Sequence, residues 1–173
     1  VFLVLFFLIM LCLVLLEKPM ETQDDSLFLI PEDEIFPGGP PKDGIPSIDF
    51  PKFVSSLEAD TWIADNELVL FLEFEDVYRV YPLQIMVWHE IVNDQIFDKR
   101  ILVTYCPLCG TGIAYLPIVA GEEVEFGVSG KLYQSNLLMY DRLTDSYWTQ
   151  IDGKAVVGSS IGEELEAISI DTL

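Results

Sequence analysis

The stretch RILVTYCPLCGTGIAYLP, residues 100–117, decides the fold that we expect for this chain. Its first part, Arg100 to Tyr105, is rich in β-branched and aromatic residues, which are typical of a strand. Its last part, Gly112 to Pro117, predicts the returning strand of an antiparallel pair. Between the two lies a turn in which two cysteines stand two residues apart.

Similar runs on both sides of this turn predict a domain built mainly from strands. Leu68 to Phe74 and Val77 to Tyr81 flank Glu75-Asp76 and predict a hairpin. A short helix is expected after a capping Ser55 or Ser56. Further strands are expected at Glu123 to Ser129, Leu132 to Tyr140, Ser146 to Gln150, Ala155 to Val157 and Leu165 to Ile170. We therefore expect an α+β fold, mainly antiparallel β, with a partly closed sheet or barrel.

One helix is predicted between the hairpin and the cysteine strand, from Pro82 to Val92. Proline suits the first turn of a helix, and apolar side chains occupy nearly the whole circumference of this one. Such a helix should be buried. The only histidine, His89, lies on it beside Glu90, and a buried carboxylate must be neutral, paired or bound to something. The three tryptophans, Trp62, Trp88 and Trp148, are expected in the core.

The chain begins with an apolar segment that suggests a membrane location. Val1 to Leu16 carries no charge, and we interpret it as a truncated transmembrane anchor or signal segment. Residues 17–42 form a polar, Pro/Gly-rich linker, and residues 43–173 form the globular domain. The flank after Leu16 lacks a basic cluster, so we expect a single-pass protein of the cell membrane with its domain outside the cytoplasm.

The formal net charge of −20 lies entirely after Leu16 and makes the domain strongly acidic. Nucleic acids and anionic lipid surfaces are bound through basic patches. The composition therefore argues against a nucleic-acid partner.

The pair Cys106 and Cys109 allows three interpretations. A thiol–disulfide pair would use one cysteine as nucleophile and the other as resolving thiol. An open copper or zinc site would take both sulfurs and His89, whereas a closed zinc site would need four ligands, and the chain has no second cysteine pair. The third interpretation is a structural disulfide or two packed thiols. In the first case, His89 and Glu90 would tune protonation if they lie close to the sulfurs.

Three other polar residues give weaker signals for the same site. Asp141 and Arg142 read most simply as a salt pair at a strand end, and could instead line the site. Ser129 precedes Gly130 in a sequence that lacks the helix and lysine of a phosphate-binding loop, so a tight turn is the simpler interpretation.

Five motifs in order resemble a known family. They are Asp43 to Pro46, Trp88 to Asp94, Tyr105 to Thr111, Phe126 to Tyr133 and Leu138 to Arg142. Together they resemble the bacterial and archaeal family of domain of unknown function 3179. The resemblance implies a secreted or membrane-anchored protein and names no activity. It also implies a reactive site, because some members carry selenocysteine in place of cysteine, and a C-terminal truncation, because members usually continue past Leu173 with a second histidine.

These observations lead to one main hypothesis and two alternatives. The main hypothesis is an extracytoplasmic, membrane-tethered thiol oxidoreductase with Cys106, Cys109, His89 and Glu90 in its site and a redox protein as partner. The first alternative is a metal-binding or metal-delivery module that passes copper or zinc to a metal-trafficking partner. The second is a structural subunit of a membrane complex.

Overall fold

Antiparallel strands dominate the computed structural model, which describes residues 27–173. The apolar segment Val1 to Leu16 and part of the linker lie outside the described residues. Within residues 27–173, no helix combines the length and the hydropathy needed to cross a membrane.

The elements follow one another closely along the chain. They are a 3-10 turn (Glu32–Glu34), β1 (Ile35–Pro37), α2 (Ser56–Ala59), β2 (Val69–Phe74), β3 (Val77–Pro82), α3 (Leu83–His89), β4 (Ile91–Ile96), β5 (Lys99–Cys106), β6 (Thr111–Leu116), β7 (Ile118–Val119), β8 (Glu122–Glu123), β9 (Phe126–Tyr133), β10 (Asn136–Asp141), β11 (Tyr147–Thr149), β12 (Ala155–Val157), β13 (Glu166–Ile168) and β14 (Ile170–Thr172).

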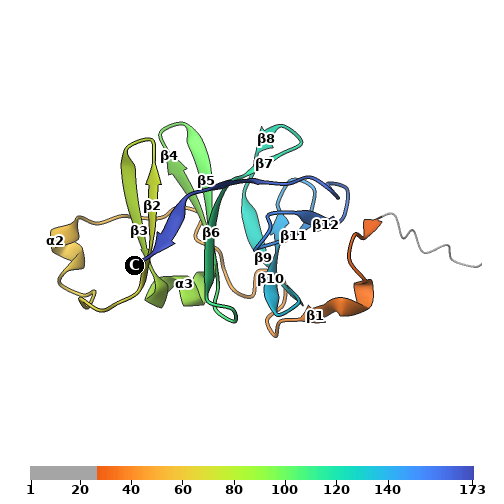
Figure 1. Cartoon of the computed structure of the whole chain (residues 1–173), viewed down its shortest axis with the longest axis horizontal. Helices are drawn as coiled ribbons and strands as arrows, with labels where there is room; N and C mark the ends of the chain where they lie inside the picture. Colours follow the sequence, from red (N-terminus) through yellow and green to blue (C-terminus); the bar gives the residue numbers. More distant parts are fainter. Residues whose placement is uncertain (1–26) are drawn as a thin grey trace, which may run out of the picture.

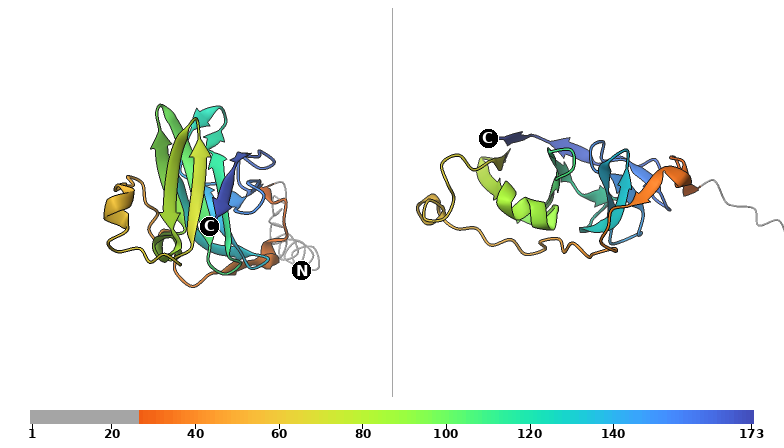
Figure 2. Two further views of the ribbon diagram at one scale, coloured as in Figure 1. Left: turned by 60° about the vertical axis from the view of Figure 1, so that its left-hand side comes forward. Right: turned by 90° about the horizontal axis from the view of Figure 1, so that it is seen from below.

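The first half of the strands forms a half-barrel (Figure 1; Figure 2, right). Sheet β14-β2-β3 and sheet β13-β6-β5-β4 are joined because β13 and β14 follow each other with only Ser169 between them. β13 pairs with β6, and β14 pairs with β2. The strand order is therefore β3-β2-β14/β13-β6-β5-β4, open between β3 and β4. This confirms the expected partly closed antiparallel sheet.

A second sheet, β1-β9-β10-β11-β12, packs against the half-barrel and creates two cores. β5 separates them, because its residues alternate between the two sides. Ile101, Val103 and Tyr105 belong to the core inside the half-barrel. Leu102 and Cys106 belong to the core between the half-barrel and the five-stranded sheet. Burial on both faces explains why β5 reads as an almost unbroken apolar run.

Two tight turns show what the sequence did and did not signal. Glu75 and Asp76 both have positive φ, as a two-residue turn between β2 and β3 requires, and the predicted hairpin is confirmed. Gln134 and Ser135 also have positive φ and turn β9 into β10. The single strand predicted from Leu132 to Tyr140 is therefore wrong. Neither turn residue is glycine or asparagine, so the pattern gave no sign of the break.

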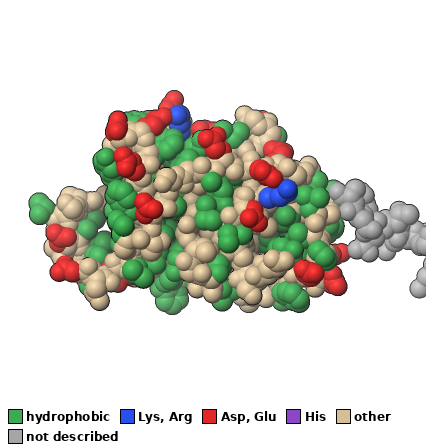
Figure 3. Space-filling view, viewed as in Figure 1, with side chains coloured by type: hydrophobic (Ala, Val, Ile, Leu, Met, Phe, Trp, Pro, Cys, Tyr) green, Lys and Arg blue, Asp and Glu red, His purple; other side chains and the backbone are tan. Residues whose placement is uncertain are grey.

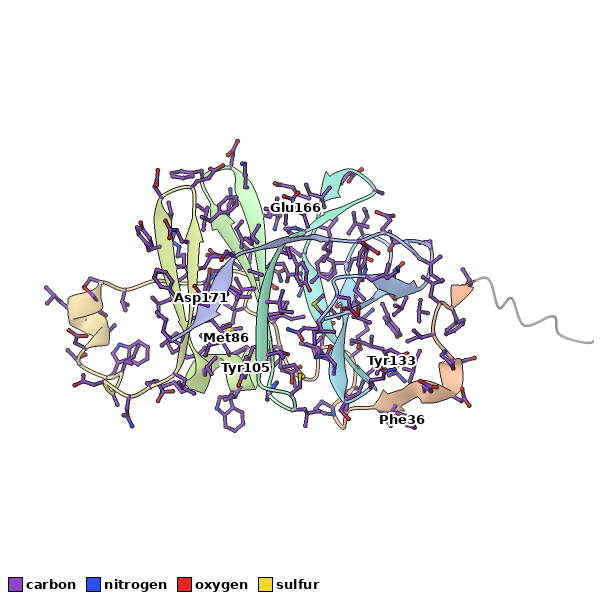
Figure 4. The ribbon with its side chains drawn as sticks, viewed as in Figure 1. Phe36, Met86, Tyr105, Tyr133, Glu166 and Asp171 are labelled. Carbon is purple, nitrogen blue, oxygen red and sulfur yellow. The ribbon has the colours of Figure 1, made fainter. Side chains whose placement is uncertain are left out.

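The predicted buried helix is also corrected. α3 ends at His89, where Glu90 adopts a positive φ of 59°, and Ile91 and Val92 begin β4 instead. Only Leu83 and Met86 are buried within α3, and Met86 faces the half-barrel near Tyr105 (Figure 4). The helix lies at one end of the half-barrel, so its outer side faces solvent.

The tryptophans divide in the same way. Trp148 is fully buried, as expected, whereas Trp62 is 48% exposed and Trp88 is 74% exposed. The core positions predicted for Trp62 and Trp88 are therefore wrong. Each stands on a short helical segment or turn that has packing on one side only.

Candidate thiol site

The cysteine turn connects β5 to β6 at one end of the half-barrel. Cys106 is the last residue of β5 and pairs with Thr111, the first residue of β6. The turn is closed by a hydrogen bond from the Gly110 N–H to the Cys106 carbonyl, 2.9 Å, and Gly110 has a φ of 65° that suits glycine. Both cysteines are free thiols. Cys106 is buried and Cys109 is exposed.

The sulfur of Cys109 is surrounded by hydrogen-bond donors. Asn136 donates from Nδ2 over 3.1 Å, and the Thr111 hydroxyl lies 3.0 Å away. Partial burial opposes ionisation, but the hydrogen bonds from Thr111, Cys106 and Asn136 outweigh it and lower the pKa of Cys109. The exposed thiol of the pair is therefore the one that ionises more easily.

Cys106 has the opposite character. Burial raises the pKa of its thiol, and its hydrogen bond to Cys109 adds to the rise. The backbone N–H groups of Cys109 and Leu137 hydrogen-bond to the sulfur and offset part of this effect. When one proton is shared by the two sulfurs, it therefore resides on Cys106, and the negative charge resides on Cys109.

Gln150 holds the donors of Cys109 in place, although it was not among the predicted site residues. Its buried amide Oε1 accepts from Thr111 Oγ1 at 3.1 Å and from Asn136 Nδ2 at 2.8 Å. Its Nε2 donates to Thr104 Oγ1 at 3.0 Å and to the Thr111 carbonyl at 3.3 Å. That carbonyl can only accept, so it fixes which way the Gln150 amide faces, and this in turn directs the amide nitrogen of Asn136 toward Cys109.

His89 is oriented by a contact away from the cysteines. Its Nδ1 lies 2.8 Å from the carbonyl of Pro46, so a neutral ring donates there and keeps Nε2 as an acceptor. No hydrogen bond joins His89 to either sulfur in residues 27–173. In the same residues, no group of three or more His, Cys, Asp or Glu side chains is placed to hold a metal ion. The structure therefore does not bring Cys106, Cys109 and His89 together as a ready three-ligand site.

Glu90 lies beside the end of β5 through its backbone. Its carbonyl accepts a hydrogen bond of 2.7 Å from the N–H of Tyr105, the residue before Cys106. Burial raises the pKa of the Glu90 carboxyl to about 7. Arg79 pairs with Asp94 and not with Glu90, and no hydrogen bond or ion pair reaches the Glu90 carboxyl in the described part of the chain. The roles of His89 and Glu90 in thiol protonation stay predictions.

Ser129 and Asp141 make contacts that stabilise turns. The Ser129 hydroxyl donates to the carbonyl of Leu138 at 2.5 Å and accepts from the backbone of Lys131 at 3.0 Å. Asp141 is fully buried and accepts from Trp148 Nε1 at 2.9 Å and from Thr144 Oγ1 at 2.7 Å. These bonds account for both polar groups as structural ones.

Arg142 fastens the segment before the half-barrel to the second sheet. It donates to Asp49 at 2.9 Å, to Glu125 at 2.8 Å and to the hydroxyl of Ser47 at 2.8 Å. Asp49 also accepts from Asn93 of β4 at 2.8 Å. The predicted salt pair between Arg142 and Asp141 is thus replaced by pairs with Asp49 and Glu125.

The family assignment covers all of the thiol site. Residues 42–173 match the family model described as "Protein of unknown function (DUF3179)". The chain belongs to the DUF3179 family. This confirms the resemblance seen in the five motifs, and the matched part of DUF3179 includes Cys106, Cys109, Thr111, Asn136 and Gln150. The chain matches no curated protein and no solved structure.

Proposed function

We propose that this DUF3179 protein carries out thiol–disulfide exchange, with Cys109 as nucleophile and Cys106 as resolving thiol. The main support is the difference between the two cysteines. Cys109 is exposed and its pKa is lowered, whereas Cys106 is buried and its pKa is raised. The thiolate is the attacking species in exchange, so an accessible, easily ionised thiol beside a protected one suits the two successive steps.

The proposed reaction transfers two electrons from the protein to a disulfide. The Cys109 thiolate attacks one sulfur of the substrate disulfide, forms a mixed disulfide and releases the other substrate sulfur as a thiolate. Cys106 then gives its proton to the released thiolate and attacks Cys109. The Cys109–substrate bond breaks, and the second substrate sulfur leaves as a thiolate. The protein ends as a Cys106–Cys109 disulfide and the substrate as two thiol groups, one of them ionised.

The surface around Cys109 suits a substrate that approaches from outside. Pro107, Leu108 and Gly110 are exposed together with Cys109, and Leu108 is 67% exposed. The face seen in Figure 3 carries scattered acidic side chains and few basic ones. A disulfide on a neutral or basic partner is therefore favoured over one on an acidic partner. Anchoring through Val1 to Leu16 outside the cytoplasm, where disulfides persist, belongs to the same proposal.

Trapping of the mixed disulfide tests this proposal. Oxidised glutathione is added to the reduced protein and to Cys106→Ser and Cys109→Ser variants, and the products are weighed by mass spectrometry. We expect Cys106→Ser to accumulate glutathione on Cys109, Cys109→Ser to accumulate much less, and the unaltered protein to lose two hydrogens through the internal disulfide. An adduct that forms mainly on Cys106, or no internal disulfide, would overturn the proposal.

A metal-binding or metal-delivery role is the second candidate, because backbone N–H groups point at both sulfurs. Cys109 and Leu137 hydrogen-bond to the Cys106 sulfur in this way, and Thr111 does so to the Cys109 sulfur. Such bonds stabilise paired thiolates on copper(I) or zinc, with the remaining ligands supplied by a partner. Elemental analysis of protein purified without chelator distinguishes the candidates. Stoichiometric copper or zinc that Cys109→Ser removes would favour the metal role.

A structural subunit of a membrane complex, in which the cysteines only stabilise the turn, is the third. Replacing both cysteines by serine would then lower stability and leave assembly and activity intact.

A further inference from the structure

The half-barrel is open between β3 and β4, and side chains bridge this seam in place of a strand ladder. The Tyr81 hydroxyl donates to Asp94 Oδ2 over 2.8 Å. Arg79 approaches the same carboxylate, with 3.7 Å between Nε and Oδ2. The two strand edges are therefore tied together at one level and separated elsewhere.

A cavity of about 510 Å³ lies at this seam, between β3, α3 and the chain that carries α2. This volume is within the range of small-molecule sites, which are mostly apolar with a few placed polar groups. Its walls fit that description. Six of the apolar lining residues are Ile48, Phe53, Trp62, Val80, Ile85 and Met86.

Arg79 also lines the cavity and has an unused donor. Its Nε is buried and has no hydrogen-bond partner, because Asp94 Oδ2 at 3.7 Å is too distant for one. Asp94 is already satisfied by the Tyr81 hydroxyl and by the backbone N–H of Gln95 at 2.7 Å. The Phe53 ring, 4.2 Å from the guanidinium carbon, covers one face of the group. A buried donor without an acceptor is costly, so an acceptor supplied by a ligand would be favoured.

The charges around Arg79 select the type of acceptor. Asp94 lies close enough to compensate the guanidinium charge, and Lys52 and Asp60 of the lining offset each other. The chain as a whole carries −20. An anionic ligand would add repulsion, whereas a neutral carbonyl would satisfy the Nε–H without adding charge.

We propose that this seam cavity binds a neutral acyl ester or amide, with its hydrocarbon chain among the apolar walls and its carbonyl oxygen on Arg79 Nε. The site is separate from the cysteine turn, and the inference does not depend on the proposed thiol chemistry. The ligand class follows from an apolar cavity and one uncommitted, charge-compensated donor.

Calorimetric titration of the full chain with three matched probes tests this inference. The probes are 1-octanoylglycerol, its ether analogue 1-O-octylglycerol, which lacks the carbonyl, and octanoate, which carries a charge. We expect saturable binding of the ester, about ten-fold tighter than the ether because one hydrogen bond to a charged donor is lost. Octanoate should bind more weakly than the ester.

Two variants separate the carbonyl contact from cavity occupancy. Arg79→Lys keeps a cation near Asp94 and removes the Nε–H, so it should abolish the preference for ester over ether. Val80→Trp, at a position 42% exposed on β3, should fill the cavity and weaken both neutral probes while circular dichroism stays unchanged. Absence of saturable binding, as when an apolar segment of the chain itself fills the cavity, would overturn the inference. Equal affinity for ester and ether, or tightest binding of octanoate, would also overturn it.

Discussion

Asn136 donates a hydrogen bond from Nδ2 to the sulfur of Cys109 over 3.1 Å, although the two residues belong to different sheets. Cys109 lies in the turn between β5 and β6 of the half-barrel, and Asn136 begins β10 of the five-stranded sheet. The reactive form of the thiol therefore depends on the packing of the two sheets. A change at their interface should alter thiol chemistry even where it leaves the cysteine turn itself untouched.

Thr111→Val should lower the reactivity of Cys109 at neutral pH. The substitution keeps the side-chain shape and removes the hydroxyl 3.0 Å from the sulfur, so we expect the pKa of Cys109 to rise by about one unit. Thr111→Ser keeps the hydroxyl and should behave like the unaltered protein. The rate of alkylation by iodoacetamide against pH checks both. Equal rates for the valine and serine variants would show that the hydroxyl has no influence.

Gln150→Leu should destabilise the fold and raise the pKa of Cys109 together. It removes a buried amide that bonds to Thr104, Thr111 and Asn136, and it leaves their polar groups without partners. We expect a loss of roughly 1–3 kcal/mol in the free energy of unfolding, measured with urea. Thr149→Val, a neighbouring polar-to-apolar change outside this network, serves as the control. A leucine variant as stable as the unaltered protein would contradict the network.

Glu90→Gln should alter how stability depends on pH. Because burial raises the pKa of Glu90 to about 7 in the folded state, the native protein holds this proton more tightly than the unfolded chain does. Stability is therefore greatest below the unfolded pKa and falls as the pH rises toward 7. We expect the variant to lack this fall and to be more stable than the unaltered protein at pH 8. Glu166→Gln, at an exposed strand position, should not have this effect. Parallel stability curves for Glu90→Gln and the unaltered protein would contradict it.

His89→Gln should leave the reactivity of Cys109 unchanged and lower stability slightly. The imidazole Nδ1 is committed to the carbonyl of Pro46, and no hydrogen bond joins it to the sulfurs in residues 27–173. Alkylation rates across the pH range, compared with those of Thr111→Val, measure the difference. A fall as large as that of Thr111→Val would instead support the original hypothesis that His89 sets thiol protonation.

The strands and the cysteine pair could be predicted from sequence, whereas the supporting network could not. β5 and β6 are contiguous β-rich runs, and the cysteines stand out by their spacing. Gln150 lies 39 positions after Thr111, and nothing in a polar residue at the end of a short strand indicates that it reaches back to the turn. The buried helix was overestimated because an apolar run can continue into a strand, as it does at Ile91.

The ionisation of the two cysteines, measured in one sample, tests the central claim most directly. Reduced protein is alkylated with iodoacetamide at a series of pH values, and peptides carrying Cys106 and Cys109 are quantified separately by mass spectrometry. We predict that Cys109 reacts first, with an apparent pKa below that of an ordinary thiol, and that Cys106 reacts only at much higher pH. Equal pKa values, or a lower value for Cys106, would contradict the account.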